Sequence, residues 1–374
     1  MQERSSVGGY LNATGTLEIE RPASAVAAGI SSKDRGWIES PAYDLALLVL
    51  SPAAGLLFAL LNQTTQFGNF AGLLVLYFVG LPHYLSTFSF YLGDQNRDHY
   101  RLRWTAFFLG PVIIFSSVLG LQLLGVKGVG VVAAVIFTWN IYHVSLQSGG
   151  ILSLYRRLNA GDQMEKRWAN MTILSVNAAM SFWFVNYFPP LYNLLVLVHP
   201  AAPLVLRYAC LATALVSGIG YTYYLLKRPG PVRVPERVFL VSSLLLFHPY
   251  LWMRDYHAAA VTMLTGHFIQ YLGIVWLLNR RKYTQQVGGS AAQRLLIKIS
   301  SRPRMVLGSL LFLGALFLLM DRGSRLVGMH VGYDIVWGSL VLIHFYVDGL
   351  VWAFRDSFVR KTVGPYLVLD SHQV

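Results

Sequence analysis

Charged residues and cysteine are both scarce in this chain of 374 residues. Only 13% of the residues are charged, about half the share of an average soluble domain, and Cys210 is the single cysteine. So few charges cannot cover a water-facing surface, which excludes a soluble enzyme and a disordered protein. One cysteine excludes an intrachain disulfide and an iron–sulfur cluster. The sequence also contains no glycine-rich phosphate-binding loop and no nucleotide motif.

Long apolar runs are abundant instead. Hydrophobic residues make up 55% of the chain, the mean hydropathy is +0.49, and several runs reach the roughly 18 residues that a bilayer requires. The sequence therefore predicts an all-α, polytopic integral membrane bundle of about ten transmembrane helices. The predicted spans are 43–62, 70–92, 104–124, 128–155, 169–188, 204–226, 237–253, 256–278, 304–320 and 331–354. We expect residues 1–40 to form a polar cytosolic N-terminal tail, 41–356 the transmembrane domain and 357–374 a cytosolic C-terminal tail.

Basic residues are distributed unequally between the two sides of this predicted bundle. The chain has 30 Lys and Arg against 17 acids, for a net charge of +13, and most of the basic residues lie in the tails and in the loops after even-numbered spans. The exceptions are Lys127, Arg207, Arg254, Arg322 and Arg325. The positive-inside rule then predicts both termini on the cytoplasmic side of the membrane, and we expect this membrane to be a bacterial inner membrane. The basic excess thus needs no nucleic-acid partner. We also expect residues 190–200 to be re-entrant or interfacial and 293–300 to form an amphipathic helix on the inner surface.

Four of the ten histidines fall at one predicted depth in the membrane. His83, His143, His267 and His344 lie in the second, fourth, eighth and tenth predicted spans, each 11 to 14 residues before the first basic residue at the cytoplasmic end. A rise of about 1.5 Å per residue places these side chains about 16–21 Å from that end, near the middle of the bilayer. His248, in the seventh span, reaches a similar depth. An imidazole in hydrocarbon is costly unless it is paired or coordinates an ion, so we predict these five residues to be metal ligands. The alternative is that each histidine hydrogen-bonds a neighbouring helix.

Polar residues follow three of these histidines at helical spacing. Gln147, Gln270 and Asp348 come three or four residues after a histidine, which puts each on the same helix face as that histidine. Metal-bound imidazoles commonly pass their second N–H to a carboxylate, amide or carbonyl. We therefore expect Gln147 and Gln270 to orient imidazoles at the cofactor, and Asp348 to act as a further ligand, a histidine partner or a catalytic proton acceptor. The alternative for Asp348 is an ion pair with Arg355 or Lys361.

Imidazoles with one carboxylate suit iron, copper or zinc better than magnesium or calcium. Iron outside a haem is the expected cofactor, and haem, copper and zinc are the alternatives. Aromatic residues flank the predicted site and would form an apolar wall for a lipid-soluble substrate, although helix packing or an interfacial belt is the simpler explanation. They are Tyr84, Phe88, Phe90, Tyr142, Phe268, Tyr271, Phe345, Tyr346 and Trp352.

The segment Gly80-Leu81-Pro82-His83 resembles the GxPH element of the Brp/Blh family. Members of that family are many-spanning membrane proteins that cleave β-carotene into retinal with a histidine-bound non-haem iron. The resemblance implies an O2-dependent oxidative cleavage of a polyene, with His83 among the iron ligands and other histidines in the remaining positions. Segments 142–150, 266–276 and 344–355 differ from the family pattern and are similar instead to a divergent group of bacterial multi-histidine membrane proteins.

The sequence therefore favours a membrane-embedded metalloenzyme, a non-haem iron oxygenase acting on a lipid-soluble, carotenoid-like substrate. Three other functions use the same residues. Paired histidines could hold a haem for electron transfer. Histidines and Asp348 could serve a transporter or proton pathway without a permanent metal. The histidines could also join helices in a structural subunit of a larger membrane complex.

Overall fold

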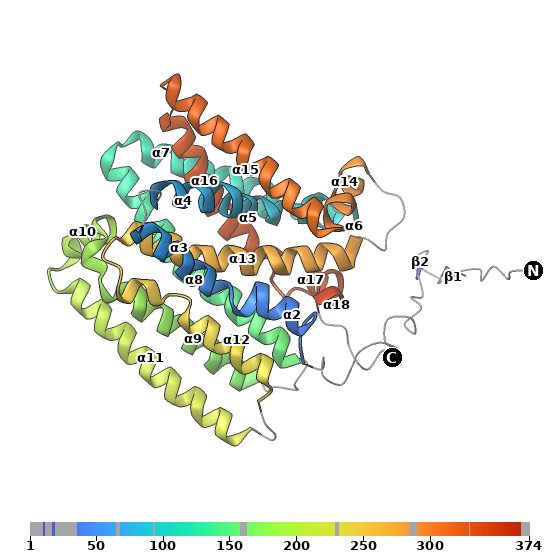
Figure 1. Cartoon of the computed structure of the whole chain (residues 1–374), viewed down its shortest axis with the longest axis horizontal. Coiled ribbons are helices and arrows are strands. Elements are labelled where there is room, and N and C mark those ends of the chain that lie inside the picture. Colours follow the sequence, from blue (N-terminus) through green and yellow to red (C-terminus); the bar gives the residue numbers. More distant parts are fainter. Residues whose placement is uncertain are drawn as a thin grey trace, which may run out of the picture. The chain divides into compact units, whose positions relative to one another are not determined.

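The computed structural model describes residues 10–11, 17–18, 36–64, 68–92, 94–157, 163–228, 232–283, 290–328 and 330–367. The chain divides into two units, residues 1–35 with 369–374, and residues 36–368. In the first unit, strands β1 (Tyr10–Leu11) and β2 (Leu17–Glu18) pair antiparallel. The described residues of the second unit are helical, so the all-α part of the prediction is confirmed for them (Figure 1).

The second unit consists of α-helices of very different lengths, which are joined or interrupted by short π and 3-10 segments. In chain order these are α2 (Pro41–Tyr43), η2 (Asp44–Val49), α3 (Ser51–Thr64), α4 (Gly68–Val75), η3 (Leu76–Gly80), α5 (Leu81–Ser86), η4 (Thr87–Leu92), α6 (Asp94–Leu102), η5 (Thr105–Leu109), α7 (Gly110–Leu123), α8 (Val126–Arg157), α9 (Gln163–Trp183), η6 (Val185–Tyr187), α10 (Pro189–Val198), α11 (Ala202–Lys227), α12 (Val234–Leu245), η7 (His248–Leu251), α13 (Tyr256–Tyr283), α14 (Ala291–Ser300), α15 (Pro303–Leu326), α16 (His330–Val351), α17 (Ser357–Thr362) and α18 (Gly364–Leu367).

Proline explains where the π segments form. Each of η2, η3 and η5 ends two or three residues before a proline, namely Pro52, Pro82 and Pro111. A proline inside a helix has no N–H to donate and its ring crowds the preceding turn. Widening that turn from i→i−4 to i→i−5 bonding keeps the remaining backbone groups paired, and such π bulges are frequent at functional sites. One of them, η3, directly precedes the turn that carries His83.

Six helices are long and apolar enough to cross a membrane. They are Phe70–Tyr91, Thr105–Leu123, Lys127–Arg156, Ala202–Lys227, Tyr256–Tyr283 and Pro303–Leu326. Segments Pro41–Val49 and Ser51–Leu61 pass the same test together but are bent by 46°, which would raise the number to seven. Three further predicted spans coincide with α9, with α12 followed by η7, and with α16. The short apolar segment predicted at 190–200 is the ten-residue α10, and α14 forms the helix predicted at 293–300.

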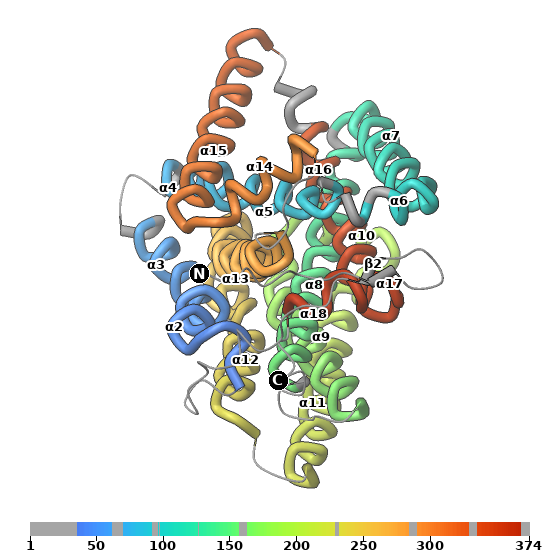
Figure 2. The backbone as a smooth tube through the Cα atoms, turned by 90° about the vertical axis from the view of Figure 1, so that its right-hand side faces the viewer, coloured from blue at the N-terminus to red at the C-terminus, as the bar shows by residue number. Residues whose placement is uncertain are grey.

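Helix α13 lies in the centre of the second unit. Of its most apolar stretch 78% is buried, against 6% for α15 and 11% for the helix Thr105–Leu123. Figure 1 shows α13 between two groups of helices, with α4, α5, α7, α15 and α16 on one side and α8, α9, α11 and α12 on the other, and Figure 2 shows the same central position in a view turned by 90°. Side chains that α13 directs to either side are therefore enclosed by protein.

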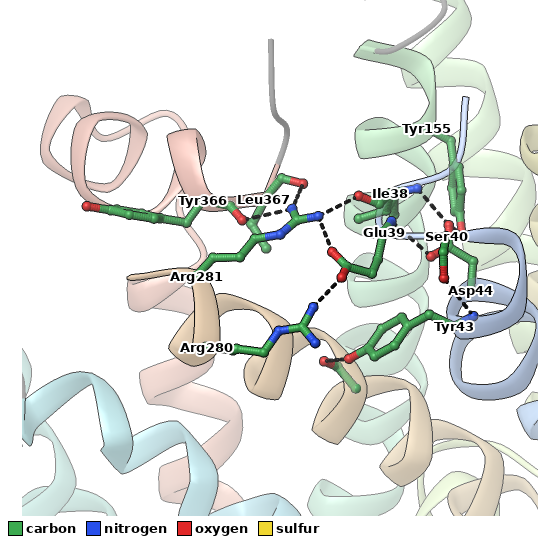
Figure 3. A network of polar contacts seen from close by, with 11 residues as sticks. Ile38, Glu39, Ser40, Tyr43, Asp44, Tyr155, Arg280, Arg281, Tyr366 and Leu367 are labelled. Carbon is green, nitrogen blue, oxygen red and sulfur yellow. Dashed lines mark hydrogen bonds and ion pairs between the residues drawn. The ribbon is translucent and has the colours of Figure 1, made fainter. Parts of the chain in front are cut away.

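Distant parts of the chain meet in a polar network at one end of the bundle (Figure 3). Arg281 of α13 donates to Ile38 O at 2.8 Å and to Tyr366 O at 3.1 Å, and both Arg280 and Arg281 pair with Glu39. These contacts join the segment before α2, the last turn of α13 and the C-terminal helix α18. Residues 38–39, 280–281 and 366 thus lie at the same end of the bundle.

A second cluster of charges is buried where α8 and α11 end and α9 and α12 begin. Arg156 contacts Glu165 at 2.8 Å and Glu236 at 3.1 Å, and Arg228 contacts the same two carboxylates at 3.1 and 3.0 Å. None of the four side chains is more than 6% exposed. Two positive and two negative charges balance one another, which is the condition for burying charge without a large penalty.

Candidate metal centre

Four histidines from four different helices meet inside the bundle. His83 lies in α5, His143 in α8, His267 in α13 and His344 in α16, and none is more than 8% exposed. The ring centroid of His83 is 4.7 Å from that of His267 and 4.5 Å from that of His344. The ring of His143 is 5.0 Å from His344 and 5.4 Å from His267. The equal depth predicted from the sequence is therefore accompanied by convergence on one point.

The nitrogens of this four-histidine group lack protein partners. Six of the eight ring nitrogens are buried and accept or donate no hydrogen bond in the described structure, namely both nitrogens of His83 and His267, and Nε2 of His143 and His344. A buried polar atom without a partner costs about 1–3 kcal/mol. Six of them in one group are a large penalty, and a single bound cation would satisfy up to four of them, one on each ring.

The spacing of these nitrogens fits one metal ion after small movements. One ligand nitrogen from each of His83, His143 and His344 lies within 4.8 Å of the other two. Metal–imidazole bonds are about 2.0–2.1 Å long, so three ligands spaced evenly around one ion are about 3.5–3.6 Å apart. Each ring would have to move inward by up to about 0.7 Å to reach that bond length. Imidazole donors suit iron, copper and zinc. The ring of His267 borders this three-nitrogen group, with its centroid 4.7 Å from that of His83 and 5.4 Å from that of His143.

A glycine just before α5 allows α5 and α13 to approach closely enough for His83 and His267 to meet. Gly80 ends the π segment η3, and a β-carbon at that position would lie 2.7 Å from Phe268 Cε2. Only a glycine permits this approach, which brings the following turn with His83 against the turn with His267. The ring of Phe268 then packs on that of His83 at a centroid distance of 4.8 Å.

A polar network lies on one side of the four-histidine group. Asp348 Oδ1 accepts hydrogen bonds from Thr87 Oγ1 at 2.9 Å and from the hydroxyl of Tyr271. Thr87 Oγ1 also lies 2.8 Å from His344 Nδ1 and 2.6 Å from the Tyr271 hydroxyl, to which Trp352 Nε1 donates at 3.3 Å. Asp348 Oδ2 is 3.9 Å from His143 Nε2. Asp348 thus contacts the histidine site, as one of the sequence-based alternatives expects.

The structure places the other predicted residues differently. His248 lies outside the four-histidine group, where its Nδ1 contacts Leu245 O at 2.6 Å and its ring stacks near Trp252. Gln270 Nε2 donates to Leu48 O at 2.8 Å, so its amide group bonds the backbone of η2 and does not orient an imidazole through this nitrogen. Gln147 follows His143 by one helical turn, and neither its Nε2 nor its Oε1 has a hydrogen-bond partner among the described residues.

Part of the predicted aromatic wall does surround the site. The rings of Tyr84 and Phe268 lie 5.2 and 4.8 Å from that of His83, and Phe345 lies 4.6 Å from His143. These residues belong to one buried hydrophobic cluster. By contrast, Tyr142 is 51% exposed and faces away from the core.

Sequence reasoning missed Thr87 and the polar roles of Tyr271 and Trp352. A signal for all three was present, because Thr87 follows His83, Tyr271 follows His267 and Trp352 follows Asp348 by four residues each. The same i, i+4 rule that identified Asp348 therefore identifies its partners. Threonine is a weak signal at such a position, because in a membrane helix its hydroxyl usually bonds its own backbone.

Comparison of the chain with protein-family models, curated proteins and solved structures gives no match.

Proposed function

We propose that the chain is an integral membrane metalloprotein whose metal is held by His83, His143, His267 and His344. The observation that carries this proposal is the convergence of four buried imidazoles with six nitrogens that have no protein partner. If the histidines only joined helices, each would contact a donor or acceptor on its neighbour. A transporter without a metal would leave the same six atoms unsatisfied in its resting state.

Within this proposal, the metal is non-haem iron and the protein is an oxygenase for a lipid-soluble, carotenoid-like substrate. When bound, iron would supply an O2-activating redox centre. The chain itself contributes four neutral donors, a carboxylate held by Thr87 and Tyr271, and an apolar lining from Tyr84, Phe268 and Phe345 that excludes water. The likeness of residues 80–83 to the GxPH element supports the choice of iron and of a polyene. Copper and zinc are the competing ions for the same donor set.

The ring packing argues against a haem. The imidazole centroids are only 4.5 to 5.4 Å apart in all four neighbouring pairs. Because each ring touches two others, a porphyrin placed between any two of them would displace the rest. The electron-transfer alternative therefore requires a large rearrangement of the four helices, whereas a single ion does not.

We further propose ten membrane crossings, with both termini on the cytoplasmic side of a bacterial inner membrane. The six apolar helices, the bent first pair, α9, α12 with η7, and α16 together supply the ten segments. The contacts among Glu39, Arg281 and Tyr366 support this arrangement, since all three lie on the predicted cytoplasmic side. In a C210A background, a cysteine at Ser290 should react with impermeant maleimide only in inverted vesicles, and a cysteine at Val327 only in intact spheroplasts.

Metal analysis tests the central proposal. Protein purified in mild detergent should contain about one iron per chain and no Soret band. The H143A/H267A variant should lose this metal, while H257A, which removes an exposed histidine from the same helix α13, should keep it. Equal metal content in the double variant would contradict the proposal, and metal-free wild-type protein with substrate-dependent ion flux would favour the transporter.

The substrate class is tested separately. Iron-loaded protein in nanodiscs should consume O2 and convert β-carotene, used as the probe, into an aldehyde product detected by chromatography. Iron binding without turnover of β-carotene would retain the metal centre but remove the carotenoid assignment.

A further inference from the structure

The hydroxyl of Thr87 is at the centre of the polar network beside the four-histidine group. It is fully buried and lies within 2.9 Å of three different partners, Tyr271, His344 and Asp348. A threonine in a helix ordinarily satisfies its hydroxyl on a backbone carbonyl of the preceding turn, as Thr172 does with Trp168 O in α9. Thr87 instead directs its hydroxyl away from its own backbone and into the site.

Counting protons determines how the network is arranged. The two hydroxyls, of Thr87 and Tyr271, carry one proton each, and both lie within hydrogen-bond distance of Asp348 Oδ1. A carboxylate oxygen only accepts, so both protons are used there. The 2.6 Å approach of the two hydroxyls to each other then follows from their shared acceptor and is not itself a hydrogen bond. No hydroxyl proton remains for the 2.8 Å contact between Thr87 Oγ1 and His344 Nδ1. That contact is a hydrogen bond only if Nδ1 of His344 carries the proton and donates it to Thr87.

From this geometry we infer that Thr87 is a positioning residue that holds His344 as the Nδ1–H tautomer and so presents the lone pair of Nε2 to the metal. The inference rests on the proposed metal function. Nε2 of His344 is one of the six buried nitrogens without a partner, as a metal-facing nitrogen should be. A neutral imidazole has one donor and one acceptor nitrogen, and the bond made by one determines the role of the other.

The carboxylate behind Thr87 strengthens the arrangement. Because Asp348 accepts from both hydroxyls, Thr87 Oγ1 is polarised and its lone pair is directed at His344. Tyr271 is itself held by Trp352 Nε1, and its ring packs at 4.5 Å from the ring of His83. The chain His344–Thr87–Asp348 thereby makes Nε2 more basic, which is the usual effect of a hydrogen-bonded carboxylate behind a metal ligand.

The variants T87V and T87S separate the hydroxyl from the shape of the side chain. Valine replaces the hydroxyl by a methyl group of similar size, and serine retains the hydroxyl without the methyl group. T172V is the matched control, because it removes a buried hydroxyl that bonds only its own helix, away from the histidines. Cu²⁺ serves as the probe for metal-free protein, since pulsed EPR of Cu²⁺–imidazole sites reports the quadrupole coupling of the remote ring nitrogen, which depends on its N–H hydrogen bond.

We expect the dissociation constant for Cu²⁺ to rise about 10–100-fold in T87V, in line with the loss of a hydrogen bond behind a ligand. The remote-nitrogen coupling of one imidazole should change in T87V and return to the wild-type value in T87S. T172V should match wild type in both measurements. If T87V does not fold, T87A removes the same hydroxyl without placing a methyl group beside Asp348, and the same two readings apply.

Wild-type affinity and an unchanged remote-nitrogen coupling in T87V would overturn the inference. So would a change that T87S does not reverse, because that would show the effect to be one of packing. Failure of the metal proposal is distinguishable, since wild-type protein would then bind no stoichiometric Cu²⁺ at the histidines and H143A/H267A would behave like wild type.

Discussion

The buried charge cluster at the ends of α8, α9, α11 and α12 allows a quantitative test of the structure. Glu236 is fully buried and accepts from Arg156 Nε at 3.1 Å and from Arg228 Nη1 at 3.0 Å. The substitution E236Q keeps the shape of the side chain but removes its charge, so two guanidinium groups then face the single carboxylate of Glu165. Removal of one partner from a buried ion pair costs about 3–5 kcal/mol, and we expect E236Q to lower the free energy of unfolding by that amount.

Two comparisons make this magnitude informative. D356N removes an ion pair with Arg103 whose side chains are 25% and 43% exposed, and an exposed pair of this kind contributes about 0–1 kcal/mol. The double variant E236Q/R228Q restores equal numbers of positive and negative charges, so it should recover part of the loss seen in E236Q alone.

Cys210 provides the assay. It is the single thiol in the chain and is partly buried in α11, so its reaction with a fluorogenic maleimide during an SDS titration reports unfolding without further labelling. If E236Q loses no more stability than D356N, or if R228Q adds its own full penalty to that of E236Q, the cluster is not a balanced buried network and the reasoning fails.

Two further outcomes follow from the packing and from the charges outside the membrane. A β-carbon at Gly55 would lie 2.2 Å from the backbone oxygen of Thr262, so G55A must separate α3 from α13 and should lower the free energy of unfolding by about 1–3 kcal/mol. A β-carbon at Gly308 meets no atom within 4 Å, so G308A should leave the stability unchanged in the same SDS assay. The backbone N–H of Phe358 holds the pKa of Asp356 below its ordinary value, so this pKa is lower in the folded than in the unfolded protein. The contribution of the Asp356 carboxylate to the free energy of unfolding is therefore complete above about pH 4 and is lost as the pH falls through the folded pKa. The stability difference between wild type and D356N should accordingly be constant from about pH 7 to pH 5 and shrink below about pH 4, and a difference that grows on acidification would contradict this assignment.

The common level of the four histidines along the bundle could be predicted from the sequence, because level follows from residue count along a helix. Their direction around each helix could not, since it depends on how neighbouring helices rotate and pack. His248 illustrates the limit. Its predicted depth assumed a continuous helix after Arg237, whereas α12 ends at Leu245 and η7 begins at His248. The change of helix type turns the imidazole to the carbonyl of Leu245 and away from the other four.

The fold was predicted correctly in class because hydrophobic length is a strong signal, and all ten predicted spans coincide with helices. The number of membrane crossings is harder to predict from hydropathy, because the first turns of α9 contain Glu165, Lys166 and Arg167 and α12 is only 12 residues long. Hydropathy does not describe helices that are shielded from lipid by their neighbours. The role of Gln270 was also beyond reach, because its partner Leu48 is 222 positions away in the chain.

The order in which the helices are synthesised has a consequence for biogenesis. The four histidines belong to α5, α8, α13 and α16, and Thr87 and Asp348 of the same site are separated by 261 positions. At about 5–20 residues per second, a ribosome needs on the order of 13–50 s to pass from the first histidine of the group to the last. During that interval the first imidazoles are already in the membrane while the last helix has not been made. The four-histidine group, and with it the proposed metal site, can therefore be completed only after α16 has been made, and a chain that stalls before α16 would lack His344 and Asp348.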